Sequence, residues 1–164
     1  MTADEVENIL LEFDPSLAPD LDESLCPYLG LNAFGEEKSR LFFGRQRLVA
    51  DLLAHLQTEH LLVIVGSSGS GKSSIARAGL LPAMKNGGFP ETEWTYLPPI
   101  VPGSDTLGNL NEALGDLKET NLVVLVDQFE EVFTLCLDEQ NRLKFAQKLL
   151  ELTRDPRFAH RVIL

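Results

Sequence analysis

An octapeptide rich in glycine and serine, placed between an apolar run and a helical pattern, restricts the fold of this chain more than any other feature. Residues 66–73 read GSSGSGKS and match the pattern G-x-x-x-x-G-K-[ST]. Residues 61–65 (LLVIV) form a short continuous apolar run, which is typical of a strand buried on both faces, and residues 72–81 favour a helix. A strand, a glycine-rich loop and a helix in this order are the context in which this motif binds phosphate groups.

The residue types of the octapeptide suit phosphate binding. Glycine lets the backbone wrap closely around phosphate oxygens, so that N–H groups point inward at the positive end of the following helix. We expect Lys72 to place its charge on the β- and γ-phosphates, where it also serves catalysis, and the Ser73 hydroxyl to bind Mg²⁺. The predicted nucleotide-binding residues of the loop are Gly66, Ser67, Ser68, Gly69, Ser70, Gly71, Lys72, Ser73 and Ser74.

A second apolar run delivers a carboxylate. Residues 121–127 (NLVVLVD) predict a buried strand beside the strand of the glycine-rich loop, with Asp127 at its carboxyl end as a Mg²⁺ ligand, acting through a water molecule. Glu130 and Glu131 follow, where ligands bind in open α/β sheets. Glu131 is the first candidate to orient or deprotonate an attacking water and Glu130 the second, although an acidic pair after a strand is also a common solvated helix start.

The remaining pattern alternates helices with apolar strands. Helices are expected at 45–57, 106–117 and 139–152, a strand weakened by Pro98 and Pro99 at 94–100, and a final apolar run from residue 161. This alternation predicts an α/β fold of the P-loop NTPase type, with three α/β/α layers, a mainly parallel sheet and right-handed crossovers. Because the last run is short for a buried strand, we expect the chain to be part of a longer protein, truncated at its C-terminal end.

Charge divides the chain into two regions. The formal net charge is −11, and residues 1–25 contain eight acidic and no basic residues. Residues 2–13 predict a short amphipathic helix that either folds back on its own domain or docks on a partner, and prolines after it predict a linker. We therefore expect an acidic leader at 1–25 and an incomplete P-loop NTPase core at 26–164. The near-neutral core has no basic footprint for nucleic acid.

Composition also excludes several classes of protein. The 164 residues suit one domain, and no apolar run approaches the roughly 20 residues that span a bilayer. The acidic N-terminus is unlike a signal peptide, and the two cysteines lack metal-ligand spacing. These features predict a cytoplasmic protein without a membrane partner.

Four motifs in order resemble the STAND class of P-loop ATPases, most closely the novel STAND group, which is NACHT-like and often precedes WD-type repeats in bacterial signalling proteins. They are F-G-R (43–45), GSSGSGKSS with the trailing AGLLP (66–74 and 78–82), Trp94 with P-G (102–103), and DQFEE (127–131). The resemblance covers about 26–164. It implies that Phe43, Gly44 and Arg45 lie near the adenine and phosphates, that ATP and Mg²⁺ bind, and that hydrolysis resets a signalling switch. It also implies protein partners or self-association through domains outside this sequence.

Two other functions remain open at this point. A small-molecule P-loop kinase would share the loop, but a basic lid with paired arginines is not evident, although Arg154, Arg157 and Arg161 form a loose cluster. An interaction scaffold could retain ADP or ATP as a structural ligand without turnover.

Overall fold

The computed structural model describes residues 30, 32–89, 94–115, 117 and 120–164. Residues 31–164 belong to one compact unit, to which all the elements below belong. The helix and linker expected within residues 1–25 lie outside the described residues, and the division into leader and core stays a prediction. In the part of the chain that is described, no helix combines the length and the apolar character needed to cross a membrane.

Four parallel strands form the sheet, which confirms the predicted fold class. They are β1 (Leu61–Leu62), β2 (Trp94–Tyr96), β3 (Asn121–Leu125) and β4 (Arg161–Ile163), arranged in the order β1-β4-β3-β2. Val162 of β4 pairs with Leu61 of β1 on one side and with Val124 of β3 on the other, so β4 lies between β1 and β3. The expectation that the Asp127 strand lies beside the loop strand was therefore wrong, because β4 inserts between β1 and β3.

Two predicted strands are shorter than their apolar runs. Beyond Leu62 the ladder with β4 ends, and Val63 and Val65 are 53% and 88% exposed, although Ile64 N–H still donates to the Leu164 carbonyl at 2.8 Å. The strand expected at 94–100 stops at Tyr96 and resumes as a bridge between Ile100 and Val126. Pro98 and Pro99 account for this interruption, since proline has no N–H to donate to a ladder.

The helices predicted at 45–57, 72–81, 106–117 and 139–152 are present close to their expected positions, and a helical turn at 36–41 was not predicted. The helical segments of the described residues are η3 (Glu36–Leu41), α2 (Gln46–Thr58), α3 (Lys72–Ser74), η4 (Ile75–Leu80), α4 (Leu81–Ala83), η5 (Met84–Gly88), α5 (Thr106–Leu114), α6 (Glu131–Thr134) and α7 (Glu139–Arg154). The four segments from α3 to η5 follow one another directly and extend past the predicted end at residue 81. Hydrogen bonding on both sides of Pro82 is of the π type, which accommodates a residue without an N–H.

The ends of α5 and α7 have identifiable causes. Gly115, with φ of +46°, ends α5 before the predicted residue 117. The side chain of Asp138 caps α7 by accepting hydrogen bonds from the N–H groups of Gln140 and Asn141.

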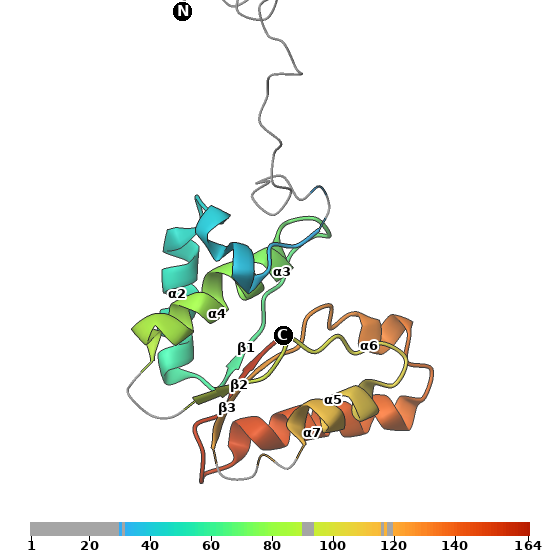
Figure 1. Ribbon diagram of the computed structural model, residues 1–164. Coiled ribbons are helices and arrows are strands. Elements are labelled where there is room, and N and C mark those ends of the chain that lie inside the picture. The colour runs from blue at the N-terminus through green and yellow to red at the C-terminus, as the bar shows by residue number, and fades with distance from the viewer. Residues whose placement is uncertain (1–29, 31, 90–93, 116, 118–119) are drawn as a thin grey trace, which may run out of the picture. The chain divides into compact units, whose positions relative to one another are not determined.

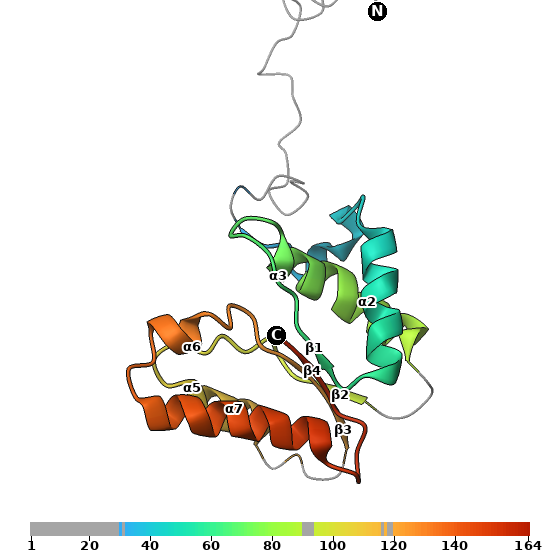
Figure 2. The same ribbon diagram turned by 180° about the vertical axis from the view of Figure 1, so that it is seen from behind.

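Side chains alternate across the sheet and fill one apolar cluster on each face. Leu122 and Val124 of β3 pack into a cluster with Leu110 of α5 and Phe145 of α7. The intervening side chains of β3 enter a second cluster with residues of α2 and the α3–η5 stretch; its members are Leu56, Leu62, Ala76, Leu80, Leu81, Met84, Phe89, Val123, Leu125 and Ile163. Figures 1 and 2 show α2 and α4 on one side of the sheet and α5 and α7 on the other. The two covered faces explain why the strands are mainly apolar.

Two polar side chains anchor the beginning of β4. Arg161 is 7% exposed, donates hydrogen bonds to the carbonyls of Leu56 and Ala159, and lies 5.4 Å from the ring centre of Trp94. His160 is buried, and its Nδ1 accepts a 3.0 Å hydrogen bond from the N–H of Leu122. That nitrogen must be unprotonated to accept this bond.

His160 makes stability depend on pH. Burial lowers the pKa of His160 below its ordinary value of 6.5; Asp155 opposes this shift, while His60 and Arg157 add to it. The unfolded chain therefore binds a proton more readily than the folded chain, so this stabilisation is complete above about pH 6.5 and is lost as the pH falls towards the folded pKa.

We expect the melting temperature of the wild type to fall more steeply between about pH 7.5 and about pH 5.5 than that of His160→Gln. Thermal unfolding at a series of pH values measures both slopes. The exposed residue His55 of α2 provides the control, since His55→Gln should keep the wild-type slope. Equal slopes for wild type and His160→Gln would contradict this assignment.

Candidate functional site

The glycine-rich loop connects β1 to α3 at the carboxyl edge of the sheet. Gly69 and Gly71 have φ angles of +75° and +88°, and a Cβ atom at either position would meet nothing within 4 Å. Backbone conformation, rather than space, therefore requires glycine at these two positions. The turn is closed by a 3.2 Å hydrogen bond from Ser70 N–H to the Ser67 carbonyl, and the Ile75 N–H donates to the Gly71 carbonyl as the helix begins.

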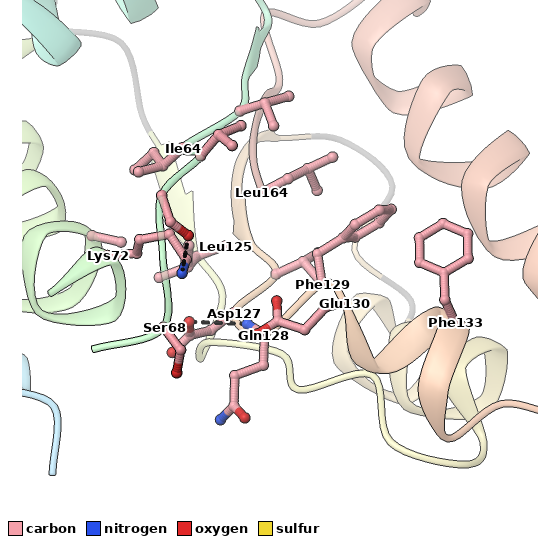
Figure 3. A pocket seen from close by; sticks show the side chains of 15 residues that line it. Ile64, Ser68, Lys72, Leu125, Asp127, Gln128, Phe129, Glu130, Phe133 and Leu164 are labelled. Atoms are coloured by element: carbon pink, nitrogen blue, oxygen red, sulfur yellow. Dashed lines mark hydrogen bonds between the residues drawn. The ribbon is translucent and has the colours of Figure 1, made fainter. Parts of the chain in front are cut away.

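The ammonium of Lys72 lies over the loop. Its Nζ donates to the carbonyls of Gly66 at 2.9 Å and Ser67 at 3.2 Å. The side chain thus points back across the space that the loop encloses, where a phosphate group would accept from the same ammonium. Figure 3 shows a pocket beside the loop, with Lys72 and Asp127 on the same side of it.

Asp127 follows β3 and is held on both of its carboxylate oxygens. Oδ1 accepts hydrogen bonds from the Ser73 hydroxyl at 2.7 Å and from the Gln128 N–H at 3.0 Å. Oδ2 forms a 2.7 Å ion pair with a terminal nitrogen of Arg77. The side chain is only 8% exposed, and Gln128 adopts a left-handed φ of 58° as the chain turns away from the strand. The structure therefore brings together Ser73 and Asp127, the two side chains proposed from the sequence as Mg²⁺ ligands.

Arg77 was not predicted from the sequence. A signal was present, because Ser73 and Arg77 are four residues apart in a helical stretch and such residues share a face. Only the position of Asp127 in space shows that this face is directed at a carboxylate.

The two candidate glutamates take different positions. Glu130 is exposed and lines the pocket beside Asp127, as Figure 3 shows. Glu131 opens α6, and its Oε2 accepts a 3.1 Å hydrogen bond from the N–H of Gly103, in the loop between β2 and α5. The side chain amide of Asn109 donates to the Pro102 carbonyl and fixes the same loop. The sequence favoured Glu131 over Glu130. In the structure Glu130 lines the pocket, whereas Glu131 does not.

A second hollow also adjoins the loop. It has a volume of about 260 Å³ and is lined by Phe34, Leu41, Phe42, Phe43, Arg45, Ser70, Gly71, Ser74 and Ile75. Phe43 is 73% exposed, and Gly44, with φ of +81°, turns the chain between Phe43 and Arg45 without lining the hollow itself. The Phe34 N–H donates to the Ser74 hydroxyl at 3.1 Å and joins this region to α3.

The pocket drawn in Figure 3 has a volume of about 400 Å³ and is lined by both apolar and charged side chains. Ile64, Leu125 and Leu164 supply apolar surface, while Lys72 and Asp127 supply charges of opposite sign. Within the described ranges, no three side chains of His, Cys, Asp and Glu gather to hold a metal ion by themselves. A cation here would therefore share its shell between protein oxygens and a ligand, as Mg²⁺ does when it binds with a phosphate group.

A loop of the pattern G-x-x-x-x-G-K-[ST], a buried carboxylate beside its serine and a parallel sheet are features of P-loop nucleotide-binding proteins. The sequence model of the Novel STAND NTPase 1 family matches residues 27–164. The chain belongs to this family, which confirms the resemblance and supports nucleotide binding and NTPase activity in general. No curated protein and no solved structure matches the chain.

We expect Gly71→Ala to lower the free energy of unfolding by about 1–2 kcal/mol, because alanine disfavours the left-handed backbone, and to abolish nucleotide binding. Gly87 is a matched control, since its φ is +91° and its Cβ would also meet nothing within 4 Å. Gly87→Ala should cost similar stability and leave nucleotide binding intact. Chemical denaturation and nucleotide titration measure the two effects, and equal binding by both variants would contradict the role of the loop.

Proposed function

We propose that this chain is a Mg-ATP-binding and slowly hydrolysing switch module of a signalling protein. The observation that carries the proposal is the 2.7 Å contact between the Ser73 hydroxyl and Asp127 Oδ1, which come from positions 54 residues apart. Two oxygen ligands thus lie side by side at the first turn after a phosphate-binding loop. This arrangement suits a metal ion that is shared with nucleotide phosphates.

The donor set fits Mg²⁺. A hydroxyl and a carboxylate are hard oxygen donors, and Asp127 is already turned towards Ser73. Ser73 would bind the ion directly and Asp127 through a water molecule. When bound, Mg²⁺ neutralises charge that develops on the phosphate oxygens.

The loop residues bind and orient the phosphates. Backbone N–H groups of the loop would offer hydrogen bonds to the phosphate oxygens at the start of the helix. Lys72 donates to the Gly66 and Ser67 carbonyls and would exchange these bonds for bonds to the β- and γ-phosphates when a nucleotide binds. Because these carbonyls are exposed to solvent, water can satisfy them after the exchange.

The hollow beside Phe43 and Arg45 is proposed to hold the adenine and ribose. Aromatic surface is available from three phenylalanines, and Ser70, Gly71 and Ser74 connect it directly to the phosphate loop. We propose ATP rather than GTP as the preferred nucleotide, on the strength of the F-G-R element in this position.

One of the two glutamates prepares the attacking water. Glu130 lies on the pocket wall, whereas the carboxylate of Glu131 is held by Gly103 N–H. We therefore favour Glu130 as the residue that orients or deprotonates water, with Glu131 fixing the loop between β2 and α5. This reverses the preference that the sequence suggested.

A switch needs other parts on which to act. We propose that nucleotide turnover is transmitted to protein partners or to further copies through domains outside this sequence, in the cytoplasm. A small-molecule kinase and a scaffold that binds nucleotide without turnover are the alternatives, and hydrolysis assays separate the switch from the scaffold.

Isothermal titration with ATP and GTP in the presence of Mg²⁺ tests the binding. We expect ATP to bind, GTP to bind at least about tenfold more weakly, and Lys72→Ala to abolish binding, because the ammonium is the main cation offered to the phosphates. Lys144→Ala, on the exposed face of α7, is a control for the loss of one positive charge. A folded wild-type chain that binds neither nucleotide would contradict the proposed function.

Hydrolysis by glutamine variants tests the catalytic assignment. We expect Glu130→Gln to lower the rate by about 10²-fold or more, since general-base catalysis contributes about 10²–10⁴-fold. Glu131→Gln should have a smaller effect, and Glu151→Gln on the exposed face of α7 should have none. Equal rates above background for wild type and Glu130→Gln would reject the role of Glu130, and the absence of any turnover by wild type would favour the scaffold.

A further inference from the structure

The ion pair between Arg77 and Asp127 is the one charged contact of the described site that the proposed nucleotide chemistry does not use. A terminal nitrogen of Arg77 lies 2.7 Å from Asp127 Oδ2. The opposite oxygen, Oδ1, accepts from Ser73 and from the backbone N–H of Gln128. One carboxylate oxygen of Asp127 therefore contacts Arg77, and the other contacts the proposed metal ligand Ser73.

The arrangement fixes the rotation of the carboxylate. Asp127 follows the end of β3, where its backbone N–H donates to the Ile100 carbonyl at 2.9 Å, so the main chain is held. Rotation about the side chain remains, and the Arg77 pair restricts it because Oδ2 must face the helix. Ser73 and Arg77 come from the same helical stretch, so a single rigid element determines where both oxygens point.

Charge gives a second reason for an arginine at this position. A carboxylate that is 8% exposed is costly unless a cation or several donors accompany it. Lys72 is directed at the loop carbonyls, so among the described ion pairs only the one with Arg77 involves Asp127. The Nε of Arg77 is buried and has no hydrogen-bond partner among the described residues. A hydrogen bond from Nε therefore does not explain the orientation of the guanidinium group.

We propose that Arg77 is a positioning residue for the metal site: by holding Oδ2 of Asp127, it keeps Oδ1 turned towards Ser73, where Mg²⁺ binds together with nucleotide. This inference rests on the proposed function. Arg77 is expected to change the affinity for the metal and not the affinity for metal-free nucleotide, because Arg77 does not line the pocket drawn in Figure 3.

The test measures the affinity for Mg²⁺ at saturating ATP and, separately, the affinity for ATP with the metal removed by chelation. We expect Arg77→Gln to weaken Mg²⁺ binding about tenfold, equivalent to about 1.4 kcal/mol, and to change metal-free ATP binding by less than about twofold. Arg77→Lys should recover part of the loss, since it keeps the charge without the planar fork. Arg47→Gln, on the exposed surface of α2, is the matched control and should behave as wild type.

A double-mutant cycle with Asp127→Asn separates positioning from general stability. In the Asp127→Asn background, Arg77→Gln should change Mg²⁺ affinity by less than about twofold, because the carboxylate that it positions has been removed. If Arg77→Gln does not fold, Arg77→Lys in the same cycle carries the test.

The outcomes distinguish the two proposals. Unchanged or tighter Mg²⁺ binding by a folded Arg77 variant, or equal losses in both backgrounds, overturns the role of Arg77 and leaves nucleotide binding standing. A wild-type chain that binds no ATP with or without Mg²⁺ overturns the proposed function and this inference together.

Discussion

The burial of one carboxylate is the constraint on which the functional end of this molecule depends. Asp127 is 8% exposed just beyond the end of β3, in which every residue after Asn121 is apolar, and water cannot solvate it fully. The helical stretch after the glycine-rich loop supplies what water would otherwise provide, a hydroxyl from Ser73 and a cation from Arg77. Because these contacts join β3 to a helix 54 residues earlier in the chain, the loop geometry and the carboxylate geometry are set together.

Most of the fold and part of the site could be predicted from the sequence. The glycine-rich loop, the buried strand that ends near Asp127 and the alternation of helices and strands depend on local pattern, and each was found in place. The order of the strands could not be predicted, because the insertion of β4 between β1 and β3 depends on pairing between residues distant in the sequence. Likewise, sequence spacing places Glu130 and Glu131 together, whereas a hydrogen bond to Gly103 separates their carboxylates in space.

The proposed role of Arg77 could not be predicted from the sequence either. Its spacing from Ser73 indicates a shared helix face, yet many surface arginines have such spacing without any function. The significance of the residue arises only when the sheet brings Asp127 to that face. Local patterns therefore predict the elements of this site, and tertiary pairing determines how their side chains meet.

The central position of β4 also affects the order in which the molecule can assemble. In the described sheet, β1 pairs with β4 alone, and the partners Leu61 and Val162 are about 100 residues apart. At roughly 5–20 residues per second, a ribosome that has completed β1 needs about 5–20 s more to synthesise β4. During that interval β1 has no partner in the described sheet, so the strand that precedes the glycine-rich loop can become native only after β4 has been synthesised. Contacts of such long range also slow folding, so this segment is one on which chaperones can act.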